Sequence, residues 1–217
     1  MSFFQIIKNF ILTKRYFYFL PRKLRLKIFN LKKLKLYKTS TGKYYLPQHA
    51  YKDLIRNEII NNMIFDKKVF DVGKSIIKEN SIVLDVGSNF GQMSVLFSKL
   101  GNNIEVYSFE ASKYLFEILT KNVEINEANV KLFNNLVGNI SSTKFNIKQA
   151  NLSKFNTYGS NKIEIVESLN NKNNSEIESV QSIKIDDIIF DKKISFMKVD
   201  VQGFDLEVLK GAKNTIL

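Results

Sequence analysis

Two short polar clusters in this chain carry residue types that could do chemistry. The first, VLDVGSNFG at residues 83–91, places an acid, Asp85, before two glycines, Gly87 and Gly91. A buried strand that runs into such a turn and then a helix presents the turn at the carboxyl edge of a parallel sheet, where folds of this kind bind ligands. Glycines in the turn would let a cofactor approach the backbone. We therefore expect a cofactor site here.

The acids around the turn indicate which cofactor it would bind. A dinucleotide fingerprint, G-x-G-x-x-G, uses three glycines to place a pyrophosphate on a helix N-terminus, and this turn has only two. Asp85 would repel a pyrophosphate but suits a cationic cofactor that carries an ammonium group. Glu110 ends the next predicted strand, where an acid accepts hydrogen bonds from ribose hydroxyls. S-adenosylmethionine, which is cationic and has no phosphate, fits both acids; an empty strand-turn-helix is the alternative.

The second cluster, KVDVQGFD at residues 198–205, supplies the candidate catalytic residues, Lys198 and Asp200. These side chains lie two positions apart on a predicted strand and so point to one face. Asp200 falls at the carboxyl end of that strand, beside the glycine turn if the two strands are neighbours. It could orient a substrate hydroxyl or take its proton as a general base, within about 3 Å. The alternative is that Asp200 caps the following helix.

Alternating strands and helices predict the scaffold that would position these clusters. The predicted strands cover residues 81–86, 104–109, 130–137, 180–185 and 194–200, with an edge-type strand at 162–167. The predicted helices cover 92–100, 112–126 and 203–214, after a helical lead-in at 51–78 and a linker or short hairpin at 39–47. Such alternation predicts crossover connections and a doubly wound α/β fold whose sheet is mainly parallel. The polar stretch 138–180 interrupts this rhythm.

Composition excludes several function classes. The chain has no cysteine, which excludes disulfides, a cysteine nucleophile and a Cys-ligated zinc site, and no His/Asp/Glu cluster predicts a metal site. Of 33 Lys and Arg residues, 13 lie within the first 52, where there is no Asp or Glu. The remainder is close to neutral, so nucleic-acid binding is not expected. The only histidine, His49, is interpreted as an incidental surface residue, with a role as base on the substrate as the alternative.

The basic arm at residues 1–38 alternates apolar and basic residues. Its uncharged runs are shorter than the roughly 20 residues that cross a bilayer, and it has no signal-peptide pattern. Peripheral contact with an anionic membrane fits this pattern. A helical segment that packs on the domain and leaves its charged side chains exposed to solvent fits it as well. We predict a cytoplasmic protein and leave association with the inner membrane surface open.

The order of four segments resembles the FkbM family of methyltransferases, from about Asp71 to the C-terminus. These segments are VLDVGSNFGQ, YSFEAS, VQSIKIDDI and FMKVDVQGFDLEVLKGA. The resemblance implies a class I, Rossmann-like fold, S-adenosylmethionine as donor, and O-methylation of a sugar, glycan or polyketide-type product. It places on the cofactor Asp85, Gly87, Asn89, Gly91, Glu110 and, near the adenine, Asn135. Ala111 and Gln202 depart from the family's usual Pro and Glu.

The resemblance also predicts a sheet of strand order 3-2-1-4 that is incomplete at its C-terminal edge. The expected divisions are a basic arm and linker at 1–52, the helical lead-in at 53–80 and the methyltransferase domain at 81–217. Such a sheet would leave an apolar strand at an exposed edge, which favours association with another chain. Three explanations remain open: the sequence is a fragment of a longer protein, an oligomer covers the edge, or the protein is an impaired enzyme. Two other functions stay as alternatives: a nicotinamide oxidoreductase and a non-catalytic protein that binds at a membrane surface.

Overall fold

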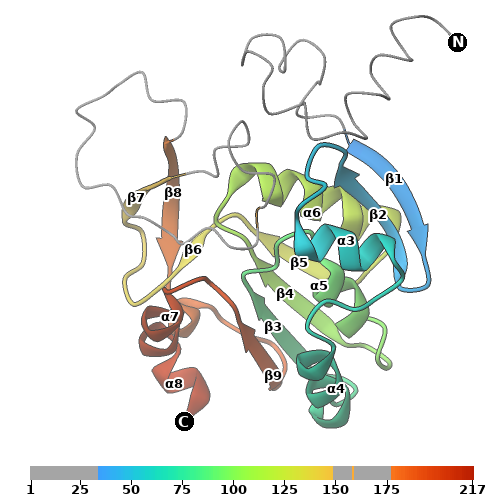
Figure 1. The fold of residues 1–217 in the computed structure, drawn as a ribbon. Helices are drawn as coiled ribbons and strands as arrows, with labels where there is room; N and C mark the ends of the chain where they lie inside the picture. Colours follow the sequence, from blue (N-terminus) through green and yellow to red (C-terminus); the bar gives the residue numbers. More distant parts are fainter. Residues whose placement is uncertain (1–33, 149–157, 159–176) are drawn as a thin grey trace, which may run out of the picture.

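A four-stranded parallel sheet forms the centre of the computed structural model, which describes residues 34–148, Tyr158 and residues 177–217 (Figure 1). Its order is β5-β4-β3-β9. The strands are β3 (Ile82–Val86), β4 (Glu105–Phe109), β5 (Val130–Phe133) and β9 (Ile194–Val199). This order confirms the predicted 3-2-1-4 arrangement and the α/β fold class. It also places the ends of β3, β4 and β9 side by side, as the candidate site requires.

The apolar residues of β3 alternate between two layers, which explains why the strand is buried at every position. Val83 packs with Phe97 on one face, whereas Leu84 packs with Val208 on the other. Among the described residues, the helices are α3 (Leu54–Ile60), α4 (Lys67–Ile76), α5 (Gln92–Phe97), α6 (Lys113–Ile125), α7 (Asp205–Gly211) and α8 (Lys213–Ile216). A short 3-10 turn, η2, covers Ile185–Asp187.

A second, three-stranded sheet corrects one prediction. Its strands, in the order β6-β8-β7, are β6 (Leu136–Val137), β8 (Ile177–Ile183) and β7 (Lys144–Lys148). The single strand predicted at 130–137 is thus two strands in two sheets, with a bend at Asn134 and Asn135 between them, where the side-chain NH₂ of Asn134 donates to the Glu110 carbonyl. In Figure 1 this sheet lies to the left of the central one, above α7. The strand predicted at 162–167 lies outside the described residues.

An N-terminal hairpin, β1 (Leu34–Thr39) and β2 (Gly42–Pro47), packs on helix α6. Asn122, which is fully buried, accepts from Tyr45 N–H at 2.6 Å and donates to the Phe90 carbonyl at 2.8 Å. Four residues later, the Asn126 side chain accepts from the Lys43 N–H at 2.9 Å. The helix therefore satisfies the open edge of the hairpin with side-chain amides, and of the two readings of 39–47 the hairpin is the one observed.

Within the described ranges, none of the helices combines the length and the apolar character that crossing a bilayer demands. Most of the basic arm, residues 1–33, lies outside those ranges, so the predicted membrane contact of residues 1–38 stays a prediction.

Candidate active site

The turn between β3 and α5 is built from left-handed residues. Gly87 and Gly91 have φ values of 82° and 83°, and Asn89 between them has a φ of 50°. The backbone N–H groups of Gly87 and Ser88 both donate to the Phe109 carbonyl, at 2.9 and 3.0 Å. Glycine tolerates this conformation without strain, and asparagine tolerates it better than most residues. The turn is thus fixed to the end of β4, beside Glu110.

Glu110 closes this side of the turn. Its Oε2 accepts from the Asn89 N–H at 2.9 Å and its Oε1 accepts from the Ser112 N–H at 2.9 Å. The side chain is buried, and burial raises the pKa of Glu110 to about 7, against the smaller effect of the two N–H donors. The structure thereby brings together two residues that the sequence assigned to the cofactor, Asn89 and Glu110.

Asp85 and Lys198 form a buried ion pair beneath the turn. Lys198 Nζ lies 3.1 Å from Asp85 Oδ1 and also donates to the Gly87 carbonyl at 3.1 Å. The other oxygen of Asp85 accepts from Ser94 Oγ at 2.6 Å, and Ser108 Oγ donates to Ser94 Oγ at 2.8 Å. Asp85 is fully buried and Lys198 nearly so. Lys198 therefore links the turn, through the Gly87 carbonyl, and strand β3, through Asp85, to strand β9.

Asp200 lies directly against Gly87. Its N–H donates to the Val86 carbonyl at 3.0 Å, and a Cβ on Gly87 would lie 2.0 Å from the Asp200 carbonyl oxygen. The glycine is thus required by the close approach of the protein's own chain. Asp200 does not cap the next helix, because α7 begins at Asp205; the side chain accepts from Gln202 Nε2 at 3.1 Å instead. The capping alternative is therefore wrong.

The two asparagines after β5, Asn134 and Asn135, donate hydrogen bonds to different backbone carbonyls. Asn135, predicted near the adenine, donates from Nδ2 to the Gln181 carbonyl on β8 at 3.0 Å. Asn134, which sequence reasoning missed, donates from Nδ2 to the backbone carbonyl of Glu110 at 2.8 Å. The tandem Asn-Asn at a strand end was the signal that could have drawn attention to both residues.

The prediction that His49 is an incidental surface residue is wrong. His49 is 5% exposed, and its Nε2 lies 3.0 Å from the hydroxyl of Tyr158, a residue of the polar stretch 138–180. Burial, with the nearby Arg56 guanidinium, lowers the pKa of His49 to about 4. His49 is therefore neutral near pH 7.

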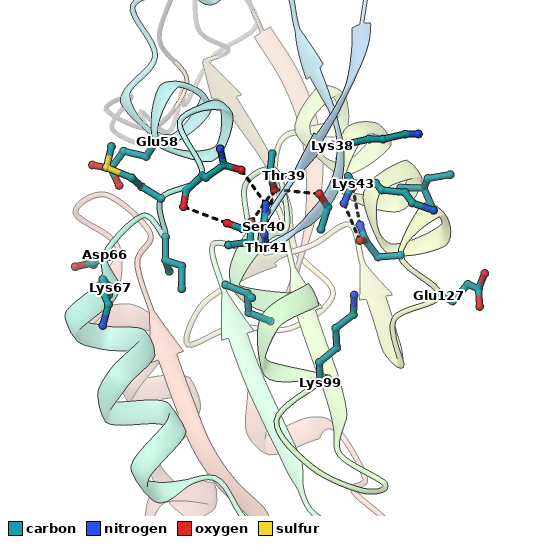
Figure 2. A pocket seen from close by; sticks show the side chains of 17 residues that line it. Lys38, Thr39, Ser40, Thr41, Lys43, Glu58, Asp66, Lys67, Lys99 and Glu127 are labelled. Atoms are coloured by element: carbon teal, nitrogen blue, oxygen red, sulfur yellow. Dashed lines mark hydrogen bonds between the residues drawn. The ribbon is translucent and has the colours of Figure 1, made fainter.

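A pocket of about 1250 Å³ lies away from these residues, between the β1–β2 turn, the start of α4 and the ends of α5 and α6. Figure 2 shows Ser40 and Thr41 at its centre and Lys99 below them. Four lysines and three carboxylates line it, so it carries no strong charge of one sign, and none of the predicted site residues belongs to it. In the described part of the chain, no cluster of three His, Asp or Glu side chains could hold a metal ion.

A parallel sheet of this order, with a two-glycine turn after β3 and a buried acid after β4, is typical of Rossmann-like proteins that bind a nucleoside cofactor at the carboxyl ends of the strands. A family model described as the methyltransferase FkbM domain matches residues 85–217. The chain therefore belongs to the FkbM family of methyltransferases.

Comparison with solved structures finds partial likenesses. One is a SAM-dependent methyltransferase from Aquifex aeolicus, at 26% identity over 41% of this chain and 45% of that one, with a TM-score of 0.32. Another is a SAM-dependent O-methyltransferase from Thermotoga maritima, at 19% identity over 47% and 40%, with a TM-score of 0.33. A third is M. jannaschii TYW2 in complex with AdoMet, at 14% identity over 46% and 42%, with a TM-score of 0.32.

The chain spans less than half the length of each of these solved proteins. No curated protein sequence matches the chain.

Proposed function

We propose that this chain binds S-adenosylmethionine on the turn at residues 87–91 and on Glu110, and transfers its methyl group to a hydroxyl oxygen of a sugar, glycan or small natural product. One observation carries the proposal: the carboxylate of Glu110 accepts the N–H of Asn89, so the turn and the acid form one cradle. Family membership supports the reaction class.

The residues present fit this cofactor. Each oxygen of Glu110 accepts one backbone N–H, and a carboxylate has about four acceptor positions, so two remain for ribose hydroxyls. Glu110 and Asp200 give the cradle a negative character that suits a sulfonium and would repel the phosphates of a dinucleotide. When bound, the cofactor supplies an electrophilic methyl group.

Asp200 is the proposed catalytic residue. The contact of its backbone with Gly87, in the proposed cofactor turn, supports this role. Asp200 would take the proton of the acceptor hydroxyl as that oxygen receives the methyl group that the bound cofactor would supply. Lys198, which the sequence also assigned to catalysis, would hold Asp85 and Gly87 in place. Much of the rate would come from orienting two reactants.

Calorimetric titration of the full chain with S-adenosylhomocysteine and, separately, with NAD tests the proposal. We expect saturable binding of S-adenosylhomocysteine and none of NAD. Binding of NAD alone would support the oxidoreductase alternative, and binding of neither compound would contradict a working cofactor site.

The affinity for S-adenosylhomocysteine is expected to depend on pH through Glu110. Only the ionised carboxylate accepts from both ribose hydroxyls, so the dissociation constant should fall as the pH rises through about 7 and level off above 8. His49 does not titrate in this range because its pKa is near 4. Calorimetry at pH 6 and pH 8 should differ by several-fold, up to about tenfold, and Glu110→Gln should bind more weakly but equally at both. An unchanged pH dependence in that variant would contradict the assignment.

A cytoplasmic location and an acceptor other than nucleic acid are parts of the same proposal. They rest on the lack of cysteine and on the near-neutral charge of the chain beyond its basic arm.

A further inference from the structure

A buried polar group lies next to the cofactor turn and has no part in the mechanism above. Tyr158 is held at two points: its backbone N–H donates to Asp53 Oδ2 at 2.7 Å, and its hydroxyl lies 3.0 Å from His49 Nε2. Its ring packs edge-on against Phe90, with ring centroids 5.9 Å apart. Because Phe90 follows Asn89 directly, this contact reaches the residue whose N–H Glu110 accepts.

Burying the polar side chains of His49 and Tyr158 together is energetically unfavourable unless their hydrogen bonds are satisfied. His49 and Tyr158 are 5% and 7% exposed, and His49 Nδ1 is buried with no hydrogen-bond partner among the residues described. Leaving a buried polar atom unpaired is unfavourable, and an apolar pair of similar size would avoid that cost. The bond to Tyr158 is therefore the one described hydrogen bond that orients the imidazole. Its geometric effect is to fix the tyrosine ring against Phe90.

Phe90 is held from its other side as well. Its carbonyl accepts from Asn122 Nδ2 at 2.8 Å, and its N–H donates to Asn89 Oδ1 at 2.8 Å. Its side chain is fully buried among β2, α3 and α6. The position of the Asn89 N–H thus depends on how tightly Phe90 is packed, and Tyr158 provides one wall of that packing.

We propose that His49 and Tyr158 are positioning residues for cofactor binding: their hydrogen bond holds Tyr158 against Phe90 and so keeps the Asn89 N–H where Glu110 binds it. This inference rests on the proposed function of the turn. In this role the two residues need no contact with the cofactor or the acceptor. They act through Phe90.

Two substitutions break the hydrogen bond with little change in shape. Tyr158→Phe removes only the hydroxyl and keeps the ring against Phe90, and His49→Leu removes both nitrogens. His49→Gln restores a polar atom close to the position of Nε2. We expect the first two variants to weaken binding of S-adenosylhomocysteine by up to about tenfold, the effect of one buried hydrogen bond, and His49→Gln to remain within about threefold of the wild type.

Tyr44→Phe is the matched control. It removes a buried tyrosine hydroxyl that donates to the Thr41 carbonyl at 3.0 Å within the β1–β2 hairpin, and it leaves the aromatic ring in the core. A comparable loss of stability is expected there without loss of affinity. Thermal unfolding of every variant, with calorimetry well below the midpoint, separates stability from binding.

Because His49 is the only histidine of the chain, its two imidazole ¹⁵N signals can be read without assignment. We expect Tyr158→Phe to shift the Nε2 signal, and S-adenosylhomocysteine to shift it in the wild type. If the wild type binds and both hydrogen-bond variants bind equally well, positioning by this pair is wrong while the proposed function stands. If the wild type does not bind, the proposed function itself fails, and this inference with it.

Discussion

Lys198→Met is expected to lower the free energy of unfolding by about 3–5 kcal/mol, because it leaves the carboxylate of Asp85 buried without a counter-ion. Asp85 is 0% exposed and Lys198 is 7% exposed, so water cannot replace the lost partner. Ser94 continues to donate one hydrogen bond, which offsets only part of the cost. The substitution also removes the contact with the Gly87 carbonyl, so the turn is expected to loosen.

The double variant Asp85→Asn/Lys198→Met is the control for this prediction. It removes both charges, and the amide introduced in place of the carboxylate would keep an oxygen for the Ser94 hydroxyl, so most of the lost stability should return. Urea unfolding followed by circular dichroism measures all three proteins. If the double variant is as unstable as Lys198→Met, the loss comes from packing of the lysine stem and the ion pair is not the cause.

The sequence predicted the central sheet because its strands are short, apolar and separated by helices with clear periodicity. Asp85, Glu110 and Asp200 each lie at or near the carboxyl end of such a strand, and parallel strands end at one edge of the sheet, so their proximity could be inferred. The structure confirms the strand order that this inference needed.

Other contacts could not be predicted because they depend on tertiary packing. Asn122 reads as an ordinary polar residue within a helix, yet its amide holds the hairpin and the Phe90 carbonyl. His49 and Tyr158 are 109 positions apart, and nothing local marks either as buried. The same limit applies to Asp85: its position suggested a contact with the cofactor's ammonium group, while the structure places Lys198 and Ser94 on its two oxygens.

Glu110→Ala is expected to weaken binding of S-adenosylhomocysteine by about 100-fold. Two hydrogen bonds from ribose hydroxyls to a charged acceptor are worth about 3 kcal/mol or more in total, and the Asn89 N–H also loses its partner.

The stability of the fold should respond to Glu110→Ala differently from the affinity. A buried carboxyl whose pKa is raised from 4.5 to about 7 stabilises the fold fully below pH 4.5, and that contribution is lost as the pH rises through 7.

At pH 8 the Glu110→Ala variant therefore removes an ionised group whose burial is unfavourable. Its midpoint of thermal unfolding should lie near that of the wild type, although its affinity for S-adenosylhomocysteine is much lower. Glu105→Ala is the matched control, because Glu105 begins the same strand and pairs with Lys131 at 3.1 Å, at the opposite edge of the sheet. It should bind S-adenosylhomocysteine as the wild type does. Equal affinity in the Glu110 and Glu105 variants would show that Glu110 is not part of the cofactor site, because the loss of a side chain that binds the ribose must weaken binding.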